Sequence, residues 1–280
     1  MENDTKKAPL VFYDIAFRPP VQETTCAVNP WKARYALNFK NADYSTTWVP
    51  MPDIPKVRKA VGAPPVRKFT DGTDFYTLPM LTDATTGTTL GDSFDIAIHL
   101  QTTYPAAGAG DLFPPQALDF VYAPSGPLLV PLSERTDPPP YAEYSRFNSV
   151  VDGLFTAHVV LALQGFPWDP ATVEATKAEF MRRAGVSSWE QMSVPEEVRG
   201  TIMGSFQAAL EGLAKLFQRD GSGPFLLGAQ PSYGDCIVGA WLKMMQATLP
   251  NKEWEQLSSW HDGVFGRLHE ALQKQFGQVK

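Results

Sequence analysis

The first half of the chain alternates between two patterns of hydrophobic positions. Short apolar and aromatic runs at 9–15 and 44–50 have the length and composition of β-strands. Between them, apolar residues recur at helical spacing over 29–40, where Asn29 suits an N-cap and Pro30 the first helical position. A strand, a helix and a strand in this order predict a parallel pair joined by a crossover.

The pattern then changes to shorter elements. A helix is predicted after Asp53, which suits an N-cap, and Gly62 with the prolines behind it marks the end of that helix. The runs 75–81 and 87–90 flank turn-forming residues and predict an antiparallel hairpin. A further helix begins at the acidic and hydroxyl residues that follow Gly91. These elements predict a mixed sheet covered by helices.

From about residue 112 the sequence contains little that resembles a strand. A Pro-rich stretch at 131–140 comes first, and long helical patterns follow at 141–164, 171–184, 195–217, 233–247 and 254–276. We therefore predict an α/β domain over residues 1–104 and an all-α domain over residues 112–280, joined near residues 103–111.

Composition and charge narrow the class of protein. The chain has 280 residues, of which 44% are hydrophobic and 19% charged, so it can bury a large core. Its net charge of −6 gives no general attraction for nucleic acid. The two cysteines show no metal-ligand spacing, and no apolar run reaches the roughly 18 residues of a membrane span. No secretory signal is recognised, which favours a cytoplasmic protein without a membrane partner.

The stretch "YTLPML" places Pro79 inside a strand pattern. Proline removes a donor from the ladder, so this position indicates an edge strand or a cis bond. An ordinary edge proline is the more common case. A cis Leu78–Pro79 bond would turn the backbone N–H and C=O of Leu78 outward, where an extended peptide-like ligand can pair with them.

The stretch "GDSFDIAIHL" opens a helix at Asp92 and Ser93. One interpretation is a plain N-cap with a polar first turn. The other is a ligand cradle, in which the helix end and Ser93 take a carboxylate and Asp92 takes an ammonium group.

The stretch "PSYGDCIVGAWL" has the spacing of a capping box at Ser232 and Asp235. We interpret it as a folding element that opens a buried helix of the second domain.

These three features, in this order and spacing, resemble the cytosolic glutathione transferase superfamily, and the resemblance covers nearly the whole chain. That family combines a thioredoxin-like α/β N-terminal domain with an all-α C-terminal domain. The finer pattern, "NPWKARYALNFK" with "WVPMPDIPK" and "DSFDIAIHLQTTYP", resembles the fungal-specific class A (FuA), which is related to bacterial lignin β-etherase-type transferases.

The resemblance implies where glutathione, as the co-substrate, is held. Leu78 before cis-Pro79 would pair with the cysteinyl peptide unit, and Asp92 with Ser93 would hold the γ-glutamyl end. Lys68 is a candidate for the glycine carboxylate, with a solvated surface lysine as the alternative. The resemblance implies no metal.

The resemblance also identifies an altered catalytic position. In the fungal class a serine is expected five residues before the lysine that matches Lys32, and this chain has Ala27 there. Asn29 remains beside it as a donor to the glutathione sulfur. Cys26 is either an inert loop thiol or the nucleophile of a thiol transferase, which requires exposure and a lowered pKa.

The resemblance therefore implies a glutathione transferase that acts on aromatic or polyphenolic electrophiles in detoxification, with activity weakened at Ala27. A homodimer is expected from the family. The alternatives are a ligandin that holds polyphenols without turnover and a Cys26-dependent thiol transferase. Aromatic side chains expected to be available for an acceptor pocket are Phe17, Trp48, Phe120, Tyr122, Phe147, Phe155 and Trp168.

Overall fold

A four-stranded mixed sheet forms the centre of the first half of the chain. The computed structural model describes residues 9–68, 72–124, 126 and 139–280, so most of the Pro-rich stretch at 131–140 lies outside the described residues. The sheet has the order β2-β1-β5-β6, and its strands are β1 Leu10–Ala16, β2 Tyr44–Pro50, β5 Met80–Asp83 and β6 Thr88–Leu90. β1 and β2 are parallel and β5 and β6 antiparallel, which confirms the predicted crossover and hairpin. The first hairpin strand was predicted over 75–81, but β5 begins only at Met80, after the proline at position 79.

A second hairpin was not predicted from the sequence. It consists of β3 Arg67–Lys68 and β4 Asp74–Phe75, which pair antiparallel. Each strand has only two residues, too few for an alternating pattern to show in the sequence.

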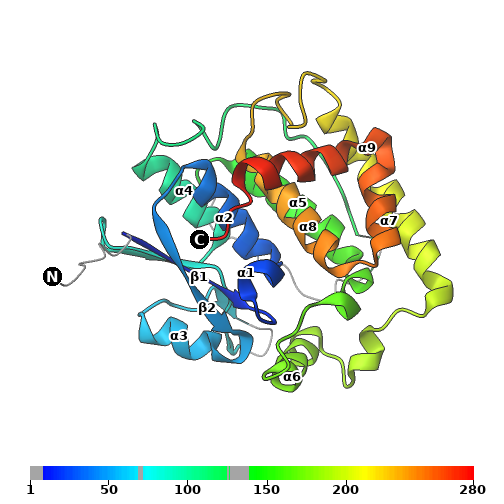
Figure 1. Ribbon diagram of the computed structural model, residues 1–280, viewed down its shortest axis with the longest axis horizontal. Coiled ribbons are helices and arrows are strands. Elements are labelled where there is room, and N and C mark those ends of the chain that lie inside the picture. Colours follow the sequence, from blue (N-terminus) through cyan, green and yellow to red (C-terminus); the bar gives the residue numbers. More distant parts are fainter. Residues whose placement is uncertain (1–8, 69–71, 125, 127–138) are drawn as a thin grey trace.

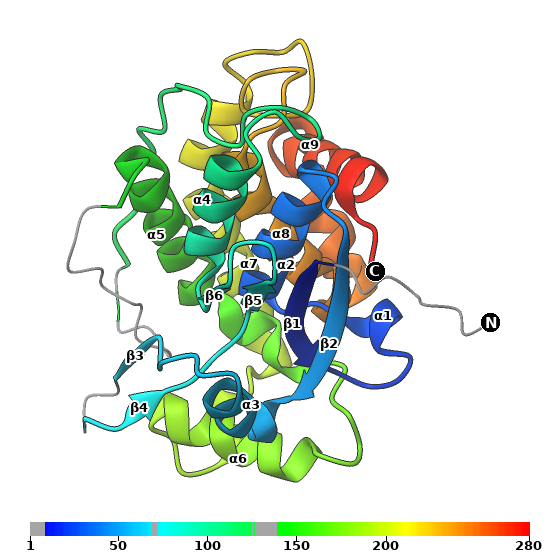
Figure 2. The ribbon, with the colours of Figure 1, turned by 90° about the vertical axis from the view of Figure 1, so that its left-hand side faces the viewer.

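The helices of the first half are the short α1 Val21–Thr24, then α2 Val28–Phe39, α3 Ile54–Ala60 and α4 Ser93–Thr103. Of these, α2 and α4 cover the side of the sheet that faces the second half of the chain (Figures 1 and 2). Phe94 of α4 and Trp31 of α2 share one hydrophobic cluster with Phe12 of β1. Ile54 of α3 belongs to a second cluster with Ile15.

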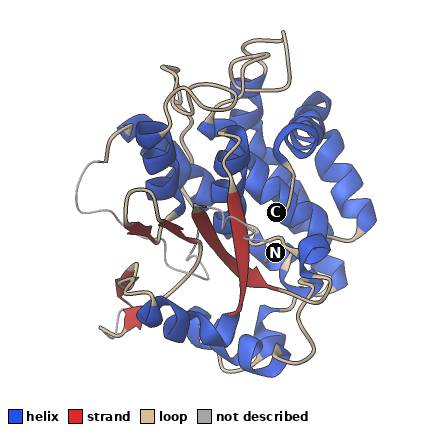
Figure 3. Cartoon of the chain, turned by 60° about the vertical axis from the view of Figure 1, so that its left-hand side comes forward, coloured by secondary structure: helices blue, strands red, loops and turns tan. Residues whose placement is uncertain are grey.

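The regular elements described in the second half are helices, as predicted, and loops connect them (Figure 3). Its helices are α5 Ala142–Ala157, α6 Val173–Ala184, α7 Glu196–Phe217, α8 Tyr233–Thr248 and α9 Asn251–Phe276. Ser232 and Asp235 form the predicted capping box at the start of α8.

Two of these helices depart from the predicted ranges. α5 is shorter than predicted, because it ends at Ala157 and two 3-10 turns follow it, Val159–Leu161 and Leu163–Gly165. The second turn passes close to α8, where a Cβ on Gly165 would lie 1.8 Å from the carbonyl oxygen of Thr248. The backbone of α9 is broken between Trp260 and Gly263, where Gly263 has a φ of +72°.

Helix α2 is enclosed between the sheet and α8. All ten of its residues from Pro30 to Phe39 are buried, including two that carry charge. Each charge is paired: Lys32 lies 2.5 Å from Asp152 of α5, and Arg34 lies 2.7 Å from Asp14 of β1. A buried charge needs such a partner, so these pairs allow polar residues in an enclosed helix.

A membrane-spanning helix must be both long and apolar. Over the described residues no single helix meets both requirements. One bent pair, Ala142–Ala157 with Val159–Gly165, meets them jointly at an angle of 52°.

The buried His269 of α9 makes stability depend on pH. Burial, together with the nearby Lys243 ammonium, lowers the pKa of His269 to about 4. In the unfolded chain this histidine takes up a proton below about pH 6.5. In the folded protein it takes up the proton only near pH 4. The free energy of unfolding should therefore fall by about 3 kcal/mol as pH drops through this window.

Urea unfolding of the wild type and of His269→Phe between pH 7 and pH 4 measures this contribution. The variant should lose less stability across the window, because phenylalanine does not titrate. An unchanged pH profile in the variant would contradict the assignment to His269.

Candidate functional site

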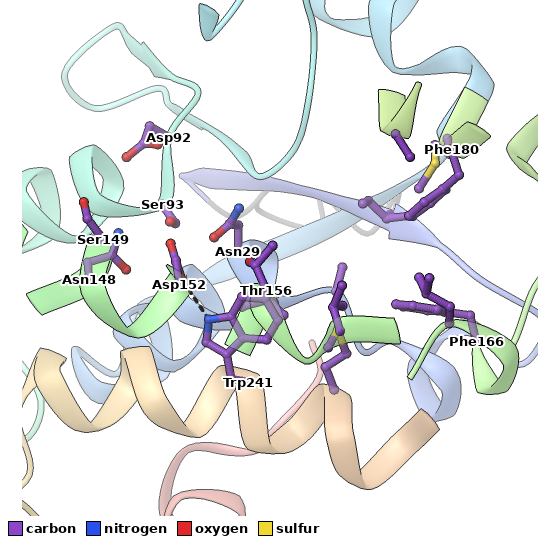
Figure 4. A pocket seen from close by; sticks show the side chains of 18 of the residues that line it. Asn29, Asp92, Ser93, Asn148, Ser149, Asp152, Thr156, Phe166, Phe180 and Trp241 are labelled. Atoms are coloured by element: carbon purple, nitrogen blue, oxygen red, sulfur yellow. Dashed lines mark hydrogen bonds between the residues drawn. The ribbon is translucent and has the colours of Figure 1, made fainter. Parts of the chain in front are cut away.

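A cavity of about 320 Å³ lies between the helices of the first half and α5, α6 and α8. Its lining changes along its length (Figure 4). The polar side chains are Asn29, Arg67, Asp92, Ser93, Ser145, Asn148, Ser149, Asp152 and Thr156. The apolar side chains include Phe17, Met51, Phe166, Phe180, Met192 and Met244. Such a cavity suits a ligand with one polar and one apolar part.

The start of α4 forms the polar end of the cavity. Asp92 is the N-cap, and its carboxylate accepts hydrogen bonds from the N–H groups of Phe94 at 2.8 Å and Asp95 at 3.3 Å. Ser93 follows it, and its carbonyl accepts a hydrogen bond of 3.1 Å from the Tyr233 hydroxyl, which ties α4 to α8. A helix N-terminus with a hydroxyl and a carboxylate can bind a carboxylate and an ammonium group side by side.

The start of α2 opens into the middle of the cavity. Ala27 is the N-cap residue of this helix and makes no side-chain cap hydrogen bond. Val28 and Asn29, the first two helical residues, line the cavity, and the third is Pro30. The N–H groups of Val28 and Asn29 have no acceptor one turn earlier, so this end of the helix attracts an anion.

The loop before α2 is held by a buried network. The Thr25 hydroxyl donates to the Asp14 carboxylate at 3.1 Å, and the Trp31 indole N–H donates to the Thr25 carbonyl at 2.9 Å. Arg34 pairs with the same carboxylate. Burial raises the pKa of Asp14, and the Arg34 guanidinium opposes that shift. The network fixes the position of Ala27 relative to β1.

Helix α5 contributes a polar wall. Its cavity-lining residues Ser145, Asn148, Ser149, Asp152 and Thr156 recur at helical spacing on one face. The Lys32 ammonium donates to Asn148 at 2.8 Å and to Asp152 at 2.5 Å. The indole N–H of Trp241 donates to Asp152 at 2.7 Å (Figure 4). This wall is therefore anchored to both α2 and α8.

Arg67 of β3 also lines the cavity. Its guanidinium lies over the Phe75 ring at 4.4 Å, and the guanidinium of Arg183 lies 4.6 Å from the same ring. Arg183 pairs with Glu179 at 2.7 Å, whereas Arg67 pairs with no carboxylate in the described part of the chain. Burial, and then the charge of Arg183, lower the pKa of Arg67. An uncompensated cation at a cavity wall suits a ligand carboxylate.

Two family profiles match this chain. The glutathione S-transferase N-terminal domain matches residues 28–103, and the glutathione S-transferase C-terminal domain matches residues 170–275. Together they cover well over half of the sequence, including the starts of α2, α4 and α8. The chain belongs to the glutathione S-transferase family.

Individual relatives extend the similarity over nearly the whole transferase chain. The glutathione S-transferase-like protein ustS of Aspergillus flavus is 27% identical over 98% of this chain and 94% of its own length. The glutathione S-transferase CsGST63524 of Ceriporiopsis subvermispora, solved in complex with glutathione, is 27% identical with a TM-score of 0.77, covering 97% of this chain and 98% of that one. GSTFuA2 of Phanerochaete chrysosporium, at 24% identity, covers 97% of this chain and 99% of its own and shows the same fold with a TM-score of 0.74.

Four of the site residues predicted from the sequence of this transferase lie at one cavity. Ala27, Asn29, Asp92 and Ser93 all line it. The prediction of Asn29 as the N-cap is wrong, because α2 begins at Val28 and Asn29 lies inside its first turn. Proline is still accommodated there, since its missing N–H would have no acceptor in the first turn.

The Leu78–Pro79 peptide bond is cis, as the family resemblance implies. Both side chains are buried, and neither is among the residues that line the cavity in the described chain. The Leu78 carbonyl accepts a hydrogen bond of 3.3 Å from the Thr77 hydroxyl. The Leu78 N–H donates to no group within the described residues, so its backbone keeps a donor for an extended ligand.

Lys68 does not reach the cavity. Its side chain is 68% exposed and lies 3.8 Å from Asp74. Neighbouring residues of a strand point to opposite sides, so Arg67 faces the cavity and Lys68 faces solvent. The sequence pattern of two residues could not show which of the two basic side chains points inward.

Cys26 lacks both properties that the thiol-transferase alternative requires. It has no exposed surface and belongs to a cluster with Phe17 and Leu78. Burial raises the pKa of its thiol, so it is held as the neutral thiol. Among the described residues, no group of three or more His, Cys, Asp or Glu side chains is placed to hold a metal ion.

The apolar end is built mostly from residues that the sequence did not single out. Of the seven aromatic candidates, Phe17 lines the cavity, and Trp168 packs behind it with ring centroids 5.9 Å apart. Phe166 and Phe180, which were missed, face the cavity instead. The polar stripe on α5 was also missed, although its helical spacing is visible in the sequence.

Proposed function

We propose that this protein binds glutathione at the polar end of the cavity and conjugates its sulfur to electrophilic aromatic molecules at the apolar end. The observation that carries the proposal is the order of three features in one cavity: the start of α4, the start of α2 and the aromatic end (Figure 4). In this order the zwitterionic γ-glutamyl end of glutathione lies at the start of α4, and its cysteine thiol lies at the start of α2. The aromatic acceptor then lies at the apolar end.

Four contacts orient glutathione in this proposal. The γ-glutamyl carboxylate binds the backbone N–H and the hydroxyl of Ser93, and the γ-glutamyl ammonium binds Asp92. The cysteinyl peptide unit pairs with the backbone of Leu78. The glycine carboxylate binds Arg67, which faces the cavity where Lys68 does not.

The chemical step requires a thiolate beside the acceptor. The N–H groups of Val28 and Asn29 at the positive end of α2, with the Asn29 amide, lower the free energy of the thiolate relative to the thiol. The thiol proton leaves to solvent. The thiolate attacks an electron-poor ring carbon, a C–S bond forms, and the leaving group departs with the electron pair of its bond. With alanine at position 27, no hydroxyl assists, so turnover is slow.

Several wider features of the proposal rest on the family and its fungal relatives. We place the chain with the fungal class A transferases, acting on aromatic or polyphenolic compounds in detoxification in the cytoplasm, as a homodimer. The division into domains at residues 1–104 and 112–280 is part of the same proposal, since the last helix of the sheet region ends at Thr103.

A second function, sequestration of polyphenols without turnover, is favoured by Ala27. In this alternative, binding of an aromatic ligand needs no hydroxyl at position 27. A measurable conjugation rate with 1-chloro-2,4-dinitrobenzene favours the transferase, and saturable aromatic binding without turnover favours the ligandin.

Binding of S-alkyl glutathiones tests whether the glutathione site and the apolar end of the cavity adjoin each other. The apolar end adjoins the position proposed for sulfur, so S-hexylglutathione should bind at least about tenfold more tightly than S-methylglutathione, at up to 0.8 kcal/mol per buried methylene. Phe180→Ala should reduce that difference and leave S-methylglutathione binding unchanged. Equal affinities for the two ligands in the wild type would show that no apolar site adjoins the sulfur.

Arg67→Gln should weaken glutathione binding by roughly tenfold, because a charged hydrogen bond contributes about 1.5 kcal/mol or more. The ethyl ester of the glycine carboxylate has no charge there, so its affinity should not change. Calorimetric titration of both ligands makes the comparison, and Arg182→Gln, on the exposed side of α6, is the control for loss of a positive charge. Equal weakening of ester and acid would place the carboxylate elsewhere.

A further inference from the structure

Arg58 of α3 is a buried cation outside the cavity lining. Its side chain is 1% exposed, and its guanidinium donates to three backbone carbonyls. The acceptors are the carbonyl oxygens of Thr77 at 2.7 Å, Gly91 at 3.2 Å and Pro64 at 2.6 Å. Two of these residues directly precede the segments proposed to hold glutathione, so one side chain joins both segments.

The hydrogen bond from Arg58 to the Thr77 carbonyl sets the direction of the Leu78 N–H. The Thr77–Leu78 peptide is trans, because the cis bonds lie at Pro19–Pro20 and Leu78–Pro79. In a planar trans peptide the carbonyl and the N–H point in opposite directions. When the Thr77 carbonyl points at Arg58, the Leu78 N–H must point away from α3. That N–H donates to no group within the described residues.

The hydrogen bond from Arg58 to the Gly91 carbonyl likewise orients the peptide at the start of α4. The Gly91 carbonyl belongs to the peptide that ends in the N–H of Asp92, the N-cap of α4. Holding that carbonyl against Arg58 fixes the peptide plane from which α4 starts. The direction of Asp92 and Ser93 into the cavity follows from that plane.

The fit around Gly91 shows how closely the guanidinium is seated. A Cβ built on Gly91 would lie 2.1 Å from one terminal nitrogen of Arg58 and 2.7 Å from its central carbon. No residue with a Cβ fits here unless the guanidinium moves. The glycine is required by this close approach and not by a left-handed backbone.

We propose that Arg58 is the positioning residue of the glutathione site. By holding the Thr77 and Gly91 carbonyls together, it sets the Leu78 N–H and the start of α4 at the spacing that a single tripeptide spans. The ligand in this statement rests on the proposed function, whereas the coupling of the two segments does not.

Hydrogen exchange read by mass spectrometry tests the coupling without any ligand. In Arg58→Met, amides in 76–81 and 91–97 should both exchange at least about tenfold faster, and those of α8 should keep their wild-type rates. Lys56→Met removes an exposed charge from the same helix and serves as the control. Unchanged exchange in both segments, or a change in only one, would overturn the proposal.

A second variant separates positioning from loss of the arginine itself. Gly91→Ala keeps Arg58 and displaces its guanidinium, so it should reproduce the faster exchange in both segments. Arg58→Lys, which can donate to two carbonyls, should restore part of the protection. Faster exchange after Arg58→Met but not after Gly91→Ala would contradict the role of the Gly91 contact.

Glutathione binding completes the test. Arg58→Met should raise the glutathione Kd at least about tenfold and leave the ratio of S-hexyl to S-methyl affinities unchanged, because the apolar end is untouched. If the wild type does not bind glutathione while the two segments lose protection together, the proposed function fails and the coupling stands. If wild type and variant bind glutathione equally, Arg58 does not position the site.

Discussion

Ala27→Ser is expected to raise the rate of glutathione conjugation by about 30- to 150-fold. Ala27 is the N-cap residue of α2 and lines the cavity where the sulfur is proposed to lie. A serine hydroxyl there can donate its proton to the thiolate, in addition to the N–H groups of Val28 and Asn29. One such donor stabilises a developing anion by about 2–3 kcal/mol, which corresponds to this change in rate.

Steady-state kinetics with 1-chloro-2,4-dinitrobenzene measures the effect, and the effect should appear mainly in kcat. Ala27→Thr and Ala27→Val are the matched pair, since they have the same shape and differ in the hydroxyl. Only the threonine variant should gain activity. Equal rates for wild type, Ala27→Ser and Ala27→Val would mean that position 27 does not face the reacting sulfur.

Asp152→Ala should lower the free energy of unfolding by about 3–5 kcal/mol, the usual effect of removing one partner of a buried ion pair. Lys32 has no exposed surface, and Asp152 is its carboxylate partner at 2.5 Å. The variant leaves the Lys32 ammonium buried beside a neutral cavity wall. It also removes the acceptor of the Trp241 indole N–H.

Urea denaturation gives the comparison, and an exposed ion pair of similar length provides the control. Glu211 and Lys215 lie 2.6 Å apart, with side chains 59% and 67% exposed. Glu211→Ala should cost less than about 1 kcal/mol. Similar losses in the two variants would contradict the claim that burial makes the Lys32–Asp152 pair important.

The elements of this fold could be predicted because their patterns are local. The period of the apolar residues located β1, β2, α4, α7 and α8, and the spacing of Ser232 and Asp235 marked the capping box. The close approach to Thr248 of Gly165, in the second of the two 3-10 turns after α5, could not be predicted. Such contacts between distant segments leave no periodic signal in the sequence.

The residues of the candidate site also divide into those with a local sequence signal and those without one. Asp92 and Ser93 were found because a helix start is a local signal with a known affinity for anions. Arg67 was missed in favour of Lys68, since only the register of the β3–β4 hairpin decides which side chain faces the cavity. Arg58 was missed because its three acceptors come from separate segments.

Calorimetric titration of glutathione into the wild type, Asp92→Asn and Ser93→Ala tests the central claim most directly. The asparagine keeps an oxygen that can cap α4 and removes the charge that is proposed to bind the γ-glutamyl ammonium. We predict saturable binding to the wild type and an affinity at least about tenfold lower in each variant, near 1.4 kcal/mol. No binding to the wild type, or equal affinity in all three proteins, would contradict a glutathione site at the start of α4.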